Sequence, residues 1–130
     1  MTRTVTIAAS VLVVLVIAIG LYITGTPATQ RALRLDQERV NGLRRTSNAI
    51  SGYWHRTGDL PGNLEQLVDG IYMDALPVDP ETGEPYEYTT LGAENFSLCS
   101  EFSLAYDSDE VTEFWQHPAG RHCFSFEMDL

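Results

Sequence analysis

Apolar side chains recur at helical spacing through residues 28–57. The stripe consists of Leu33, Val40, Leu43, Ile50, Tyr53 and Trp54. Because steps of three, four and seven return to the same side of an α-helix, this pattern predicts one long amphipathic helix. Thr26 is a suitable N-cap, Pro27 suits the first helical turn, and Gly58 suits a left-handed C-cap. The arginines of this segment fall mostly on the opposite face, which we expect to be solvated.

A second apolar segment lies directly upstream. Residues 5–23 (VTIAASVLVVLVIAIGLYI) form a run of nineteen residues without a charge. At 1.5 Å per residue, such a helix covers a hydrocarbon core of roughly 30 Å. We therefore expect a transmembrane helix. The alternative is a cleaved secretory signal, but the run exceeds the usual length of an h-region and no small-x-small cleavage site follows it.

Downstream of the long helix the periodicity changes to that of short elements joined by turns. Asn63 and Gln66 form a capping-box pattern that predicts a short helix over residues 64–69. Residues 79–83 (DPETG) form a turn signal, and strands are expected at residues 86–90, 96–102 and 123–126. The expected fold is α+β, with an N-terminal transmembrane helix and a long stalk helix packed on a small antiparallel sheet.

The two cysteines have equivalent positions in their predicted strands. Alternation places Phe96 and Leu98 inward with Cys99 outward, and Phe124 and Phe126 inward with Cys123 outward. If the two strands are neighbours, a Cys99–Cys123 disulfide forms across them. A head of about seventy residues has a marginal core, so this bond would contribute a large share of its stability.

Charge divides the chain at the end of the long helix. Residues 28–58 carry six arginines against two acids, whereas residues 59–130 carry sixteen acids against one arginine, giving about +4 and −15. So acidic a head lacks the basic footprint that nucleic-acid binding needs. The expected organisation is a short cytoplasmic end at residues 1–4, the span at 5–23, a break at 24–27, and an extracytoplasmic domain at 28–130. Within that domain, residues 28–58 are the helix and residues 59–130 the head.

The order of turn motifs resembles that of a known family. After the helix come the following motif residues: Gly58, Leu60, Pro61, Asp79, Pro80, Gly83, Pro85, Tyr86 and Tyr88. Their order is similar to that in the periplasmic domain of the major pseudopilin of type II secretion, a type IV pilin-like fold, over roughly residues 36–100. The resemblance implies a helix-backed sheet, attachment to the bacterial inner membrane, and self-assembly or binding to protein partners.

The sequence departs from the family pattern at two places, which concern the processing of the N-terminus and the binding of calcium. Residues 1–9 contain neither a Gly-Phe cleavage site nor an acid, so prepilin-peptidase processing is not expected. The family's calcium loop has a glycine-rich lead-in that is absent here. The acidic cluster Asp107, Asp109 and Glu110 could supply oxygen ligands to Ca²⁺, although a solvated acidic loop is the commoner structure.

Membrane orientation has two opposing indicators. Counting Arg3 against Arg31, Arg34 and Arg39, the positive-inside rule places the head in the cytoplasm. Paired cysteines in a small acidic head are typical of an oxidising compartment, and the family resemblance agrees with them. We therefore expect the head in the periplasm or outside the cell.

No catalytic constellation is recognisable. His55, His117, His122 and Cys123 match no common metal-ligand spacing, and surface or turn positions are the expected role of the histidines. Aromatic residues Tyr53, Trp54, Phe114 and Trp115 could form a binding platform, but packing is the expected role. We expect no enzyme activity, no small-molecule substrate and no cofactor other than the calcium considered above. The predicted function is a membrane-anchored structural or interaction module, with an ion-sensing or ligand-sensing domain as the alternative.

Overall fold

The computed structural model describes residues 1–106 and 113–129, which form two compact units, residues 1–32 and 33–130. The first unit contains helix α1 (Thr2–Thr24), none of whose residues is buried. All its valine, leucine and isoleucine residues are more than half exposed, the least exposed being Leu21 at 51%. By its length and composition alone, this helix could cross a membrane.

The predicted break and the second helix are present. Gly25 has a φ of 76°, and the Thr26 hydroxyl accepts a hydrogen bond from the Thr29 N–H at 3.3 Å, as an N-cap does. Helix α2 spans Pro27–Thr57. It ends at Gly58, whose φ of 81° is the left-handed conformation expected of a C-cap glycine and whose N–H donates to the Trp54 carbonyl at 2.8 Å.

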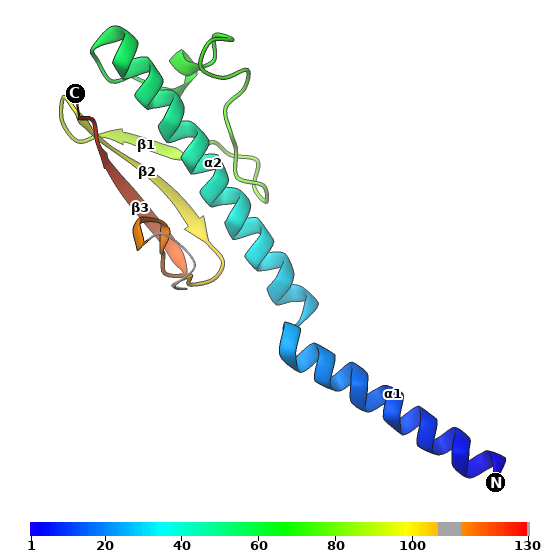
Figure 1. Ribbon diagram of the computed structural model, residues 1–130. Helices are drawn as coiled ribbons and strands as arrows, with labels where there is room; N and C mark the ends of the chain where they lie inside the picture. The colour runs from blue at the N-terminus through cyan, green and yellow to red at the C-terminus, as the bar shows by residue number, and fades with distance from the viewer. Residues whose placement is uncertain (107–112, 130) are drawn as a thin grey trace. The chain divides into compact units, whose positions relative to one another are not determined.

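The head contains a three-stranded antiparallel sheet in the order β1-β2-β3 (Figure 1). The strands are β1 (Glu87–Thr90), β2 (Asn95–Phe102) and β3 (Gly120–Glu127). The expected strands are thus confirmed, with β3 longer at both ends than its apolar pattern indicated. Helix α2 lies across one face of this sheet, and the fold is α+β.

The short helix after the Leu60-Pro61 turn differs from the prediction. It is a 3₁₀ helix, η1 (Leu64–Leu67), and not an α-helix over residues 64–69. Asn63 caps it by accepting from the Gln66 N–H at 3.2 Å, but the Gln66 side chain accepts from Gly62 instead of closing the capping box. The Asp69 carboxylate then accepts the N–H groups of Ile71 and Tyr72, and these local bonds compete with helix continuation.

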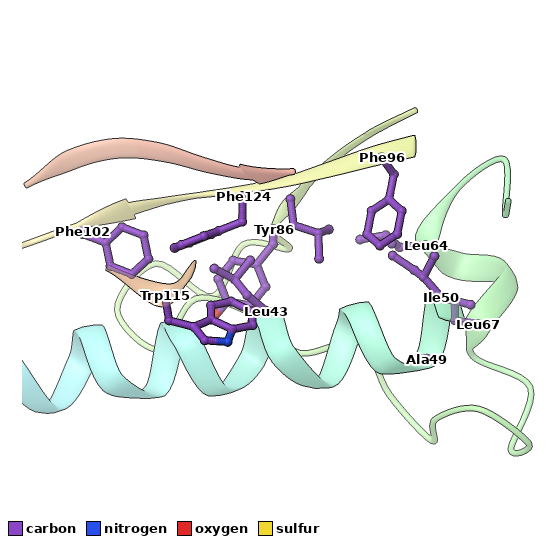
Figure 2. Close-up of a cluster of buried hydrophobic side chains, with 11 residues drawn as sticks. Leu43, Ala49, Ile50, Leu64, Leu67, Tyr86, Phe96, Phe102, Trp115 and Phe124 are labelled. Atoms are coloured by element: carbon purple, nitrogen blue, oxygen red, sulfur yellow. The ribbon is translucent and has the colours of Figure 1, made fainter. Parts of the chain in front are cut away.

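The core lies between the stripe of α2 and the inner face of the sheet. Leu43 and Ile50 from α2 and Phe96 and Leu98 from β2 are all fully buried. Figure 2 shows these two layers facing each other, with Trp115 from the 3₁₀ helix η2 (Glu113–Trp115) inserted between the helix and Phe124. The predicted stripe is therefore the face that α2 buries.

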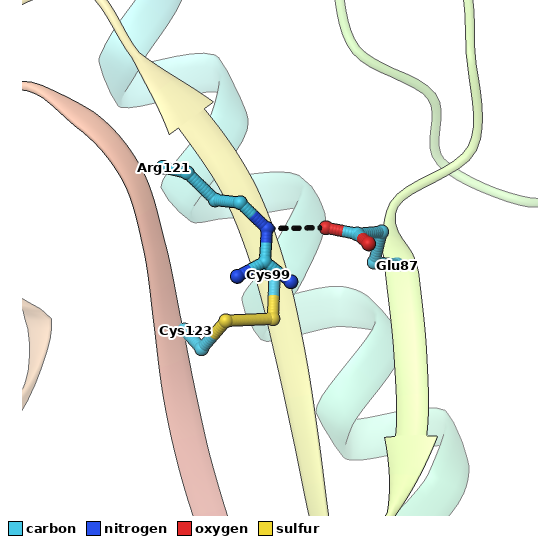
Figure 3. The surroundings of a disulfide bond; sticks show 4 residues. All are labelled: Glu87, Cys99, Arg121 and Cys123. Carbon is cyan, nitrogen blue, oxygen red and sulfur yellow. Dashed lines mark hydrogen bonds and ion pairs between the residues drawn. A yellow bond between two sulfur atoms is a disulfide. The ribbon is translucent and has the colours of Figure 1, made fainter.

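The predicted disulfide is present on the opposite face of the sheet. Cys99 and Cys123 are directly opposed in the register of β2 and β3, with Cα atoms 4.0 Å apart. Above the bond, Arg121 of β3 donates from Nε to Glu87 of β1 at 2.9 Å (Figure 3). This crossing side chain accounts for the low exposure of Cys99, 4%, on the face that α2 does not cover.

Removing the disulfide should destabilise the head. The bond joins residues 24 apart, and closing such a loop contributes on the order of 3 kcal/mol in the chain-entropy model. We expect Cys99→Ser to lower the free energy of unfolding by about 2 to 4 kcal/mol, and Cys99→Ser/Cys123→Ser to be no worse. Urea unfolding of the full chain in detergent micelles, followed by tryptophan fluorescence, measures this. Equal stability of oxidised and reduced wild-type protein would contradict it.

A close approach between α2 and the sheet requires glycine at position 42. A Cβ at Gly42 would lie 2.7 Å from the Tyr86 ring, whereas one at Gly52 would meet Tyr72 at an ordinary 3.4 Å. Gly42→Ala should therefore cost about 1 to 3 kcal/mol, because the ring is held in the core. The matched Gly52→Ala should be neutral or stabilise by up to about 1 kcal/mol through helix propensity. The same denaturation assay tests both, and equal effects would show that the Tyr86 contact does not matter.

Candidate functional site

A buried arginine binds three carboxylates, one from helix α2 and two from the turn at residues 79–83. Arg39 donates from Nη1 to Asp36 at 2.8 Å, from Nε to Asp79 at 2.6 Å, and from Nη2 to Glu81 at 2.9 Å. A fourth bond joins Nη1 to the Ser103 hydroxyl at 3.0 Å. Arg39 is 3% exposed, so the expectation of a solvated arginine face does not hold at this position. Within a helix, Arg39 and Asp36 are one turn apart, which brings them to the same side.

Backbone N–H groups satisfy the two buried carboxylates. Asp36 accepts from the N–H groups of Ser103 and Leu104, each at 2.8 Å. Asp79 accepts from Glu81 and Thr82 at 2.9 and 3.0 Å. Charged groups inside a protein are costly unless they are paired and hydrogen-bonded, and here both conditions are met. The network therefore connects α2 to the turn after Asp79 and to the end of β2.

The network favours the charged forms of Asp79 and Arg39. Burial by itself would raise the pKa of Asp79, but the hydrogen bond from Arg39 and those from the backbone more than offset it, so the pKa lies below its ordinary value. The pKa of Arg39 is raised, chiefly by its hydrogen bond to Asp79 and against the opposing effect of burial. Because the guanidinium pairs with Asp36, Asp79 and Glu81, the arrangement stabilises the fold.

Part of the predicted turn and hairpin motif, Asp79, Gly83 and Tyr86, lies beside this network. Asp79 and Gly83 close the turn through a 2.8 Å bond from the Gly83 N–H to the Asp79 carbonyl, with Gly83 at a φ of 74°. Tyr86 donates its hydroxyl to the Val78 carbonyl at 3.2 Å. Burial raises the pKa of Tyr86 to about 12, with a smaller contribution from the charge of Asp79. The motif is therefore a set of structural contacts.

The second motif tyrosine connects the hairpin to the turn that follows α2. Tyr88 donates its hydroxyl to the Pro61 carbonyl at 2.8 Å, and burial raises its pKa to about 12. Pro61 is itself fully buried. Motif positions that are 27 residues apart in the chain thus lie in direct contact.

Two of the histidines differ in environment from a simple surface position. His117 is only 5% exposed, and its ring stacks on Phe102 with centroids 3.6 Å apart. Burial lowers the pKa of His117, so the folded protein favours the neutral ring. His122 is half-buried beside Phe124, whereas His55 is exposed as expected. No local pattern indicates the burial of His117, because its neighbour Phe102 belongs to β2 and the contact forms only in the fold.

The predicted calcium ligands, Asp107, Asp109 and Glu110, lie outside the described residues, and their role stays a prediction. Among the residues that the structure describes, no group of three or more His, Cys, Asp or Glu side chains is arranged to hold a metal ion.

The aromatic residues divide between packing and exposure. Trp54 is 5% exposed, and Trp115 is 9% exposed with the Arg44 guanidinium 5.3 Å above its ring. Packing is thus confirmed for both tryptophans. Tyr53 is half-buried against Tyr72, with ring centroids 5.6 Å apart.

Phe114 is the exception, because 43% of it is exposed. It contacts the rings of Phe124 and Phe126, with centroids 5.8 and 5.2 Å away, and so extends the core to the surface beside β3.

An open groove of about 540 Å³ runs between α2 and the segment at residues 71–77. Arg45 and Asn48 line it from the helix, and Tyr72, Met73 and Asp74 line it from the segment. The sequence did not indicate this groove, because its two walls are brought together only by the fold.

Disrupting the buried network should cost more than disrupting its exposed arm. The side chain of Asp79 is 12% exposed and that of Glu81 is 54% exposed, although both bind Arg39. We expect Asp79→Asn to lower the free energy of unfolding by about 3 to 5 kcal/mol, because it leaves Arg39 incompletely paired. The matched Glu81→Gln should cost less than about 1 kcal/mol, as exposed ion pairs do. Urea denaturation of the full chain in micelles compares them.

The pH dependence of stability tests the role of Asp79 separately, by comparing Asp79→Asn with the wild-type protein. Because folding lowers the pKa of Asp79, its contribution is present above its unfolded pKa of about 3.9 and is lost as the pH falls through the folded value. Stability of Asp79→Asn should therefore change less than that of wild type below about pH 4. Parallel pH profiles for the two proteins would contradict this assignment.

Comparison with known proteins identifies no relative of this chain. No family model, curated protein or solved structure matches this chain. The functional proposal accordingly depends on the residues and contacts described above.

Proposed function

We propose that this protein is a single-pass membrane protein of the bacterial inner membrane whose extracytoplasmic domain serves as a structural or interaction module. The observation that carries the proposal is helix α1. Its apolar side chains are exposed along its whole length, and no residue of the helix is buried. An apolar surface of this size is stable in a lipid bilayer and unfavourable in water.

The disulfide supports an extracytoplasmic head. Cytosolic reductants keep most thiols reduced, whereas the periplasm and the cell exterior allow a structural disulfide to persist. The Cys99–Cys123 bond joins directly opposed residues of β2 and β3, and its Cys99 end is buried. This consideration opposes the distribution of arginines around the span, and we give it precedence because a small head depends on the bond for stability.

The order of the turn motifs, which resembles that of pseudopilins, favours a pseudopilin-like role for this domain. The helix, the C-cap at Gly58, the turn at Asp79 to Gly83 and the β1–β2 hairpin occur in the expected order. The hydrogen bond from Tyr88 to the Pro61 carbonyl shows how these two motif residues stabilise the same fold. Such a domain would act by binding protein partners or further copies of itself, and not by catalysis.

A paired cysteine-labelling experiment tests both anchoring and orientation. Thr2→Cys marks the amino end of α1, and Ala93→Cys marks the exposed turn between β1 and β2. In spheroplasts treated with a membrane-impermeant maleimide, we expect labelling at position 93 and no labelling at position 2 until the cells are lysed. The native disulfide stays in place in both variants.

Two outcomes would contradict the proposal. Labelling at position 2 but not at position 93 before lysis would place the head in the cytoplasm. Recovery of the head in the soluble periplasmic fraction, with a mass that lacks α1, would identify the apolar segment as a cleaved signal.

A further inference from the structure

Strand β3 is an edge strand, and the register of the sheet determines which of its backbone groups face outward. The β1–β2 hairpin closes with the Leu91 N–H donating to the Asn95 carbonyl at 2.7 Å. In an antiparallel ladder, hydrogen-bonded and non-hydrogen-bonded pairs alternate. Counting along the register, Glu87 and Cys99 are therefore a hydrogen-bonded pair, and the N–H and C=O of Cys99 point toward β1.

Two further observations give the same assignment on the other side of β2. The 4.0 Å Cα separation of Cys99 and Cys123 is that of a non-hydrogen-bonded pair. Beyond the sheet, the Met128 N–H donates to the Glu94 carbonyl at 2.8 Å, which continues the hydrogen-bonded series. Phe124 and Phe126 thus use their backbone groups to pair with β2.

The alternate residues of β3 direct their N–H and C=O groups away from the sheet. These residues are Arg121, Cys123, Ser125 and Glu127. Their backbone groups have no hydrogen-bond partner beyond the sheet among the residues that the structure describes. A strand of eight residues with one open edge is a ready template for a further strand.

The two faces beside this edge differ in chemistry. On the inner face, half-buried Phe126 adjoins Phe114, whose ring is 43% exposed. On the outer face, Glu127 is exposed, and the charge of Arg121 is already countered by Glu87 at 2.9 Å. An added strand would therefore meet apolar rings on one side and the exposed Glu127 carboxylate on the other.

We propose that the open edge of β3 binds an extended segment of a partner protein as a fourth strand. Its alternate side chains would be apolar, against Phe114 and Phe126, and basic, on the side of Glu127. Charge complementarity favours such a partner over a second copy of this chain, since residues 59–130 carry about −15. The inference specifies the surface for the interaction role proposed above, and its test does not involve membrane orientation.

Hydrogen exchange of the free protein is the first test. In the full chain in detergent micelles, the amides of Phe124 and Phe126 should be protected and those of Cys123 and Ser125 should exchange rapidly. A seven-residue peptide alternating valine and arginine should bind and protect the second pair. A matched peptide alternating valine and glutamate should not bind.

Methylated peptides test the predicted geometry. In a fourth strand that pairs antiparallel to β3, as the other strands of the sheet pair, and whose arginines lie on the Glu127 side, the arginine N–H groups face β3 and the valine N–H groups face solvent. N-methylation of the arginines should weaken binding about tenfold or more, because hydrogen bonds to the edge are lost. N-methylation of the valines should have little effect. Equal loss with both peptides, or no binding by the unmethylated peptide, overturns the proposal.

Protein variants separate the edge from the fold. Ser125→Pro removes an N–H that points away from β2, so the sheet ladder stays intact while the docking edge is blocked. Phe114→Ser removes the exposed ring and leaves every backbone group in place. Both should weaken peptide binding, and Glu127→Gln should reduce its salt dependence.

Near-UV circular dichroism of each variant shows whether the head has retained its packing. If Ser125→Pro disturbs the fold, Phe114→Ser and the methylated peptides still decide the question. Unchanged binding in a folded Phe114→Ser protein would contradict the proposed site.

Discussion

The arrangement of the head depends on the ion-pair network around Arg39. Helix α2 has one apolar stripe, which would pack against a sheet in more than one register. The guanidinium fixes the register, because Asp36 and Asp79 hold it while also accepting backbone N–H groups from two loops. A shifted helix would leave these charges buried without partners, at a cost comparable to the total stability of a small domain. Charge pairing thus supplies the specificity that a small hydrophobic core does not.

The sheet depends on its central strand. β2 contributes Phe96 and Leu98 to the core on one face and Cys99 to the disulfide on the other. Among the residues that the structure describes, β2 lies at the centre of the sheet, and β1 and β3 each pair with it. The disulfide therefore binds the strand on which both neighbours depend. Above it, the Arg121–Glu87 pair crosses from β3 to β1 and covers the sulfur atoms.

Most of the buried charged and polar groups in the described part of the chain form hydrogen bonds or ion pairs that stabilise the fold. Candidate functional features are therefore found mainly on the surface. Arg39, Asp36 and Asp79 satisfy one another, the motif tyrosines bind carbonyls, and His117 is stacked in the interior. The features that remain open are surfaces: the apolar helix α1, the groove beside α2 and the edge of β3. Such surfaces are suited to binding lipid and protein chains.

The sequence by itself determined the elements that are specified by residues close together in the chain. The uncharged run at residues 5–23, the stripe of α2, the cap at Gly58 and the alternation around Cys99 and Cys123 are readable because neighbours in sequence share a face at fixed periods. Even the disulfide followed, since two alternating patterns placed both cysteines on equivalent faces. The helix after Asn63 is shorter than its pattern predicts, because the Asp69 carboxylate accepts the backbone N–H groups of Ile71 and Tyr72 in competition with further helical turns.

Only the tertiary structure decided which partners the buried polar residues have. Asp36 and Arg39 lie seven and four residues before Leu43, so the helical period itself places them on the stripe of α2. The partner Asp79 is 40 residues from Arg39, and no local period indicates that pairing. His117 is buried against Phe102 of β2, and the outward direction of the β3 edge depends on how three separate strands align. Contacts of this kind arise when the chain closes long loops, and their partners are set by the packing of the whole head.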